Sequence, residues 1–432
     1  MALPDLGVDS RPISFSSSPA RKATIDFKLT PQNANPTILA STEISDIPLL
    51  EDTDMAQAKL HTDLCDLLGI EAPIFLAGMG GVRFTPPELT AAVSEAGGLG
   101  VFGATGDDPE ELRRRIRAVR ELTDKPFGVD LLLPVVTGSL ESDGQEVQPE
   151  AIRATLKREY PRHSEFVESL IGEFGLDEHR TQRELGRGGI ALARKQVEVI
   201  LEEKVPVFAA ALGDPAWLVP DAREAGTKVM GLVGNARNAA RQVKAGVDIV
   251  VAQGTEAGGH TGRIATMPLV PQIVEAVKPL PVVAAGGIAT GRGMAAALAL
   301  GAQGVWLGTA FLTATESQIF DTQKQAVLGG RSEDFVISRS YTGKTARQHR
   351  NPIVQAWENA GLDPLPMPLQ GMLMSDLSAS AEKAGRHDLL FTPAGQASGL
   401  LDELRPAADI MADLVNEAVS VLNDLHTQIS TS

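Results

Sequence analysis

Residues 281–311 read PVVAAGGIATGRGMAAALALGAQGVWLGTAF, and they contain two apolar, β-branched segments on either side of an alanine-rich one. We predict strands at 281–286 and 304–311 and a helix at 292–301 between them. Both strands are apolar throughout instead of alternating, which is typical of parallel strands buried on both faces. The stretch therefore predicts one strand–helix–strand unit of a parallel sheet.

The same alternation of apolar strands and helices is predicted toward the N-terminus. Further strands are predicted at 74–78, 99–103, 127–133, 205–212, 228–233 and 248–254, with helices at 87–97, 108–122, 191–203, 215–226, 236–246 and 268–277. Eight strands with intervening helices over about 250 residues favour a closed (β/α)8 TIM barrel, and an open doubly wound sheet is the competing architecture.

Two glycine motifs in this region do not count as nucleotide-binding signatures. Gly98, Gly100 and Gly103 have the spacing of a dinucleotide fingerprint, but they lead into a strand instead of following one. The Gly343-Lys344-Thr345 sequence matches the end of a P-loop, yet Ser338 occupies the position of its leading glycine.

The chain divides into three predicted regions. Residues 1–57 are polar and aperiodic, which predicts a disordered tail or an arm on a neighbouring subunit. Residues 58–349 form the barrel, with a charged insertion at about 137–189 after the third strand that is either a lid or a surface excursion. Residues 350–432 are predicted to be a helical extension packed outside the barrel.

Bulk properties exclude several classes of protein. The formal net charge of −16 over 432 residues argues against a nucleic-acid or anionic-membrane binder. No apolar run approaches the roughly 20 residues of a membrane span, and the N-terminus lacks the features of a signal peptide. Cys65 is the only cysteine, so intramolecular disulfides are impossible, and we expect a cytoplasmic protein. No histidine has a trusted metal-ligand spacing, so no metal is expected.

Glycines follow the last two predicted strands. Gly286 and Gly287 end the seventh strand ahead of a helix near Arg292, and Gly308 and Thr309 belong to the eighth. TIM barrels often bind phosphate at these two loops and a helix N-terminus, because glycines let the backbone approach the anion. Tight turns alone would also explain these glycines, but their position on adjacent strands favours phosphate binding.

His260 ends the loop Gly254-Thr255-Glu256-Ala257-Gly258-Gly259 that follows the sixth strand. A histidine at the carboxyl end of a barrel strand lies on the catalytic face, and its ordinary pKa near 6.5 suits proton transfer. A structural or solvated histidine is the alternative interpretation.

Seven segments resemble the nitronate monooxygenase family over about residues 60–350: APIFLAGMGG, SEAGGLGVFG, KPFGVDLLLP, VPVFAAALG, VAQGTEAGGHTGR, PVVAAGGIATGRGMAAALALGAQGVWLGTAFL and SRSYTGKTAR. The related FMN-dependent enoyl-ACP reductases share the EAGGH and AAGGI motifs. The resemblance implies an FMN-binding barrel in which His260 is the catalytic base. It also implies cofactor contacts from Ala77, Gly78, Met79, Asp130, Gln253, Gly258, Gly286, Gly287, Gly308 and Thr309.

Three departures from the family pattern accompany this resemblance. The family usually reads Gln-Ala-Pro-Met where this chain has Leu-Ala-Gly-Met at 76–79, and it often has Asn at the position of Asp130, where a carboxylate could bring a charge close to the flavin. The best-known members of the family use several active-site tyrosines, whereas this chain has only Tyr160 and Tyr341.

The expected activity is that of an FMN-dependent nitronate monooxygenase, which uses O2 to convert alkyl nitronates or nitroalkanes to carbonyl compounds and nitrite. The alternative is an NAD(P)H-dependent enoyl-thioester reductase on the same barrel, and a further alternative is a flavin-binding barrel without turnover. We expect a small-molecule substrate and O2 as partners, and the sequence is compatible with a homo-oligomer.

Overall fold

The computed structural model describes residues 59–133, 149–181 and 189–429. The predicted tail at 1–57 lies outside these residues. In the described part of the chain, no helix is both long and apolar enough to cross a membrane.

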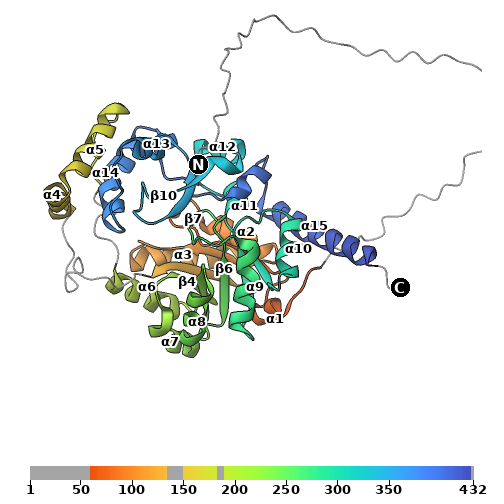
Figure 1. Ribbon diagram of the computed structural model, residues 1–432. Helices are drawn as coiled ribbons and strands as arrows, with labels where there is room; N and C mark the ends of the chain where they lie inside the picture. Colours follow the sequence, from red (N-terminus) through yellow and green to blue (C-terminus); the bar gives the residue numbers. More distant parts are fainter. Residues whose placement is uncertain (1–58, 134–148, 182–188, 430–432) are drawn as a thin grey trace, which may run out of the picture. The chain divides into compact units, whose positions relative to one another are not determined.

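Eight parallel strands form the barrel, which confirms the predicted TIM-barrel fold (Figure 1). They are β1 (Ile74–Leu76), β2 (Gly100–Gly103), β3 (Phe127–Leu133), β4 (Val207–Leu212), β5 (Lys228–Val233), β6 (Ile249–Gln253), β8 (Val282–Ala285) and β9 (Gly304–Leu307). Their order in the sheet is β1-β9-β8-β6-β5-β4-β3-β2. The two ends meet through Leu99, whose N–H donates to Ile74 O (2.9 Å) and whose carbonyl accepts from Leu76 N (3.0 Å).

Helices alternate with these strands and cover the outside of the barrel. They are α2 (Pro87–Glu95), α3 (Pro109–Leu122), α6 (Ile190–Glu202), α7 (Val219–Ala225), α8 (Ala236–Ala245), α9 (Thr266–Val277) and α10 (Gly291–Ala299). Strand residues alternate between two cores. One core lies inside the barrel and includes Phe75, Val101 and Trp306; the other lies between strands and helices and includes Leu76, Phe102 and Leu131. α1 (Asp63–Leu68) adds Leu64 and the buried Cys65 to the inner core.

Two elements differ from the sequence prediction. The predicted strand 304–311 ends at Leu307, because Gly308 adopts a helical conformation and Thr309 begins the short helix α11 (Thr309–Leu312). The predicted helix 215–226 is split into the 3-10 turn η1 (Pro215–Trp217) and α7. Pro220 lies in the first turn of α7, where a missing N–H costs no helical hydrogen bond.

A three-stranded antiparallel sheet lies next to the barrel and was not predicted. The hairpin β10 (Phe335–Ser338) and β11 (Ala346–His349) pairs with β7 (Gly259–His260), in the order β10-β11-β7. His260 is in register with Ala346, and Gly259 with Arg347. The glycine-rich loop after β6 is therefore tied to a segment about 86 residues further along the chain.

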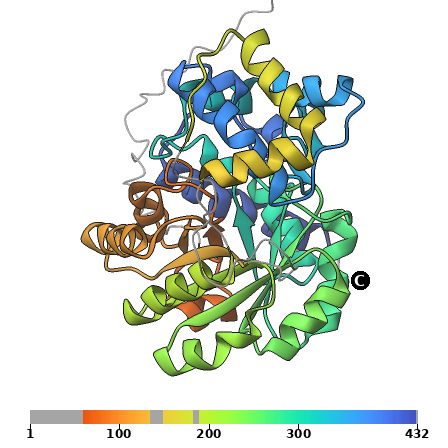
Figure 2. The same ribbon diagram turned by 90° about the vertical axis from the view of Figure 1, so that its left-hand side faces the viewer.

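The described part of the insertion packs on the C-terminal helices, and together they form a separate apolar core. Figure 2 shows α4 (Pro149–Glu159) and α5 (Pro161–Glu173), in yellow, beside the blue helices α13 (Pro352–Asn359) and α14 (Leu369–Lys383). Arg153 fixes this contact with two hydrogen bonds of 2.7 Å to the Asp376 carboxylate. The remaining elements here are α12 (Asp321–Gly329), η2 (Ser332–Asp334), η3 (His387–Leu389) and η4 (Gln396–Leu400).

The last helix, α15 (Ala407–Gln428), packs against α10 and α2. Its approach to α10 is so close that a Cβ on Gly291 would lie 2.4 Å from the backbone nitrogen of Ala418. The Glu417 carboxylate accepts a hydrogen bond from Gly291 N (2.7 Å) and also contacts Arg292. The helical extension thus covers the first turn of a barrel helix.

Candidate active site

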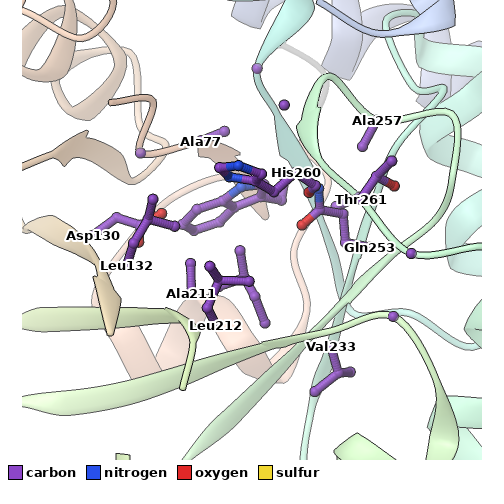
Figure 3. Close-up of a pocket in the computed structure, with 18 of the residues that line it drawn as sticks. Ala77, Asp130, Leu132, Ala211, Leu212, Val233, Gln253, Ala257, His260 and Thr261 are labelled. Carbon is purple, nitrogen blue, oxygen red and sulfur yellow. The ribbon is translucent and has the colours of Figure 1, made fainter. Parts of the chain in front are cut away.

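A cavity of about 1080 Å³ opens at the carboxyl ends of the barrel strands. This is the face on which TIM barrels build their sites, and the volume lies at the upper end of ordinary ligand pockets. All the residues expected at the site line this one cavity: Ala77, Gly78, Met79, Asp130, Gln253, Gly258, His260, Gly286, Gly287, Gly308 and Thr309. Figure 3 shows Ala77, Asp130, Gln253 and His260 around the same space.

His260 is held at the cavity wall by backbone pairing and by side chains. The β7–β11 ladder fixes its backbone, and its carbonyl accepts a hydrogen bond from Gln253 Nε2 (2.9 Å). Its ring atom Nε2 lies 3.1 Å from Thr342 Oγ1. The loop geometry therefore sets both the position and the orientation of the imidazole.

The electrostatic surroundings keep His260 uncharged at neutral pH. Burial, and secondarily the nearby Lys344 ammonium group, lower the pKa of His260 to about 4. Lys344 also lines the cavity, and burial lowers its pKa. The site thus pairs a neutral imidazole with a cationic ammonium group, an arrangement suited to an anionic ligand.

Asp130 lines the cavity from β3. Burial raises the pKa of its carboxyl group well above the ordinary value, which favours the uncharged form of the side chain. Its Oδ1 atom is buried and has no hydrogen-bond partner among the described residues.

The glycines after β8 and β9 form a second side of the cavity. Gly286 and Gly287 have φ values of 99° and 73°, a left-handed conformation that favours glycine. A Cβ on Gly308 would contact Ala77 Cβ and Met79 Sδ at 3.4 Å, and all three residues line the cavity. The Thr309 hydroxyl accepts a hydrogen bond from Gly395 N (2.9 Å), and its own proton remains free to be donated to an anion.

The helix N-terminus expected to assist phosphate binding is instead used within the protein. α10 begins at Gly291, where the Glu417 carboxylate accepts the Gly291 N–H, and the N-cap hydroxyl of Thr290 accepts the Gly293 N–H (3.2 Å). None of α10's first-turn residues lines the cavity. Any phosphate binding here therefore depends on the glycines and Thr309, without that helix terminus.

Several cavity residues were missed by the sequence analysis. Lys344 was not predicted as a site residue, because the Gly343-Lys344-Thr345 sequence does not form a P-loop motif. It does lie in the SRSYTGKTAR segment that resembles the family. Phe391, Pro393 and Ala397 reach the cavity from the C-terminal extension, and Trp217 from the turn after β4. Neither tyrosine lines it: the Tyr341 hydroxyl is buried against Leu389 O (2.6 Å).

Two solved structures have a similar fold over most of this chain. The nitroalkane oxidase of Streptomyces ansochromogenes has a TM-score of 0.71 at 30% identity and covers 84% of this chain and 100% of that one. FabK from Thermotoga maritima has a TM-score of 0.66 at 33% identity and covers 86% and 100%. With a TIM barrel, a glycine-lined cavity and a partly buried histidine, these likenesses define the class as a flavin-dependent oxidoreductase.

The family is then set by the sequence comparisons. Residues 61–417 match the nitronate monooxygenase family. Rv1533 of Mycobacterium tuberculosis, provisionally named a monooxygenase, is 39% identical over 381 residues, which is 85% of this chain and 98% of that protein. The chain belongs to the nitronate monooxygenase family.

Proposed function

We propose that the chain is an FMN-dependent nitronate monooxygenase, which oxidises alkyl nitronates and nitroalkanes with O2 to carbonyl compounds and nitrite. The observation that carries this proposal is the pairing of a neutral His260 with the Lys344 ammonium group on one wall of the cavity. A nitronate is an anion, so it gains from the ammonium charge in a partly desolvated site.

The residues of the cavity fit a flavin with one phosphate. Gly286, Gly287 and Gly308 line the cavity, where their backbone can approach a phosphate, and the free proton of Thr309 can be donated to it. Ala77 and Met79 offer an apolar surface for a ring system, and the unpartnered Asp130 oxygen offers a polar contact. When bound, the flavin supplies the redox chemistry. The glycines after β8 and β9 provide one phosphate-sized site, and the spacing of Gly98, Gly100 and Gly103 is not a dinucleotide-binding motif in its context. Both observations favour FMN over FAD.

His260 and Lys344 have different roles in the proposed reaction. The Thr342 hydroxyl has one proton, which it donates in a hydrogen bond to Lys344 O (3.1 Å). In its hydrogen bond with His260, Thr342 Oγ1 is therefore the acceptor and His260 Nε2 is the donor. His260 Nδ1 is then unprotonated and can accept the α-proton of a nitroalkane, while Lys344 stabilises the negative charge on the nitro oxygens. Because burial makes this imidazole a weak base, we expect nitronates, which have already lost the proton, to react faster.

The alternative activity is the NAD(P)H-dependent reduction of an enoyl thioester. The loop 256–260 and the strand end 284–288, which carry the motifs shared with that group, both border the cavity. The two activities differ in what reduces the flavin, and O2 is a substrate of the first alone.

Anaerobic titration of the flavin-loaded protein separates them. We expect an alkyl nitronate such as ethyl nitronate to bleach the flavin absorbance within the mixing time of a stopped-flow instrument, and NADPH to leave it oxidised. Rapid reduction by NADPH would instead favour the reductase. Reduction by neither compound would leave a flavin-binding barrel without turnover, and release of FAD on denaturation would contradict the choice of FMN.

A further inference from the structure

Asp130 occupies a position in the barrel wall where a carboxyl group is costly. It lies on β3 in register with Gly103 of β2 and Ala209 of β4, and only 5% of its surface is exposed. Ala209 belongs to the apolar core inside the barrel, and Gly103 has no side chain. Asp130 thus lies at the upper edge of that core, facing the cavity that His260 borders from the other side.

Gly78 leaves the room that Asp130 needs. A Cβ at position 78 would lie 2.2 Å from Asp130 Cβ and 2.9 Å from Oδ2, and the three nearest atoms all belong to the Asp130 side chain. Two of the positions at which this chain departs from the usual family pattern, 78 and 130, are therefore in direct contact. A side chain at 78 and Asp130 in its present conformation exclude each other.

The other titratable groups near the cavity do not pair with Asp130. His260 and Lys344 border the cavity from β7 and from the β10–β11 hairpin, and Asp214 and Arg241 from the turn after β4 and from α8. None of them forms a hydrogen bond or ion pair with Asp130, and Oδ1 has no partner in the described residues. Leaving a buried polar atom unpaired costs about 1–3 kcal/mol, so a ligand that supplied a partner would gain binding free energy.

We propose that Asp130 binds the flavin as an uncharged carboxylic acid, and that Gly78 is the small residue that makes this contact sterically possible. A protonated carboxyl group offers one O–H donor and one acceptor, whereas a carboxylate only accepts. Ionisation of Asp130 removes the donor and introduces a negative charge into a desolvated site. Flavin affinity in this chain therefore falls as the pH rises and Asp130 ionises, and Asp130 is a cofactor-binding residue.

This inference depends on the flavin site of the proposed function, and FMN titrations can test the two separately. The dissociation constant of FMN is measured by fluorescence quenching at about pH 5 and about pH 9 for wild type, Asp130→Asn and Asp130→Leu. The Asn side chain keeps N–H donors and a carbonyl acceptor at every pH. We expect the wild-type constant to rise at least about tenfold over this range, and that of Asp130→Asn to rise by less than about threefold. Asp130→Leu binds FMN weakly at both values.

The outcomes are distinct. Equal pH dependence in wild type and Asp130→Asn, or wild-type affinity in Asp130→Leu, would overturn the role of Asp130 while leaving the flavin site intact. A wild type that binds no FMN at any pH would overturn both the inference and the proposed cofactor. The absorption spectrum of the bound flavin gives a second readout, because the spectral change that accompanies ionisation of Asp130 should vanish in Asp130→Asn.

A double-mutant cycle tests the role of Gly78. Gly78→Ala alone should weaken FMN binding and lower stability, because its Cβ collides with Asp130. The same substitution in an Asp130→Gly background should cost much less, since the colliding atoms are gone. Equal costs in both backgrounds would show that Gly78 serves another purpose.

Discussion

The Nε2 atom of His260 lies 3.1 Å from Oγ1 of Thr342, a residue 82 positions further along the chain. The β7–β11 pairing creates this contact, because it places the glycine-rich loop alongside the strand that follows Thr342. Thr342 in turn contacts the backbone of Lys344, so the hairpin supplies both the partner that orients the imidazole and the charge that disfavours its protonation.

Replacing His260 with Asn separates proton abstraction from binding. We expect His260→Asn to retain FMN, because the glycine backbone and Asp130 provide the proposed cofactor contacts. Activity on a neutral nitroalkane should fall about 10²-fold or more, the usual contribution of a positioned base, while activity on the matching nitronate should fall much less. Steady-state kcat/KM on nitroethane and ethyl nitronate measures both. Equal losses on the two substrates would mean that His260 binds the anion instead.

The pH dependence of the same reaction follows from the lowered pKa of His260. An imidazole with a pKa of about 4 is unprotonated throughout the physiological range. We therefore expect kcat/KM on nitroethane to stay level as the pH falls through 6.5, and to decline only as it approaches the lowered pKa. A decline centred near 6.5, the ordinary value for histidine, would contradict the buried environment described above.

Substitutions of Lys344 should change the pH dependence of kcat/KM in a defined direction. Lys344→Met removes the secondary cause of the lowered pKa but leaves burial, the larger one, in place. The acidic decline should move to higher pH yet remain below 6.5, and KM for the anionic nitronate should rise. Lys344→Arg keeps the charge and serves as the control, so it should leave the acidic decline nearly unchanged. An identical profile in Lys344→Met would show that the ammonium charge does not reach His260.

The sequence predicted the barrel and the composition of the cavity for one physical reason. Carboxyl ends of parallel strands meet on one face of a barrel, so the residues after Leu76, Gln253, Ala285 and Leu307 had to gather. It did not reveal the contacts of Thr342 and Lys344 with His260, because a short antiparallel pairing between distant segments leaves little periodic signal. The raised pKa of Asp130 also required the structure, because burial and the absence of a partner among the described residues are tertiary properties.

Gly308 tests whether a phosphate binds beside β9. Gly308→Asp should weaken FMN binding more than Gly308→Asn, because the two side chains have the same shape and differ in charge. Two like charges at about 4 Å cost roughly 1 kcal/mol in water and roughly 4 kcal/mol near a protein surface, so the Kd for FMN should differ between them by at least about fivefold. Gly308→Ala should be mild, since its Cβ would make ordinary contacts at 3.4 Å. Equal FMN affinities for the Asp and Asn variants would place the phosphate elsewhere.

The final prediction concerns the contact between α10 and α15, which lies outside the cavity. Gly291 and Gly293 belong to the same turn of α10, yet an added Cβ meets different surroundings at each. At 291 it would lie 2.4 Å from the backbone of α15, whereas at 293 its nearest neighbour is the Ile288 side chain at 3.4 Å. Gly291→Ala should therefore lower the free energy of unfolding by about 1–3 kcal/mol or more, the usual range for overpacking. Gly293→Ala should raise it by up to about 1 kcal/mol, because alanine restricts the unfolded chain and favours a helix. Urea unfolding followed by circular dichroism measures both changes. Equal midpoints for the two variants would show that α15 is free to move away from α10.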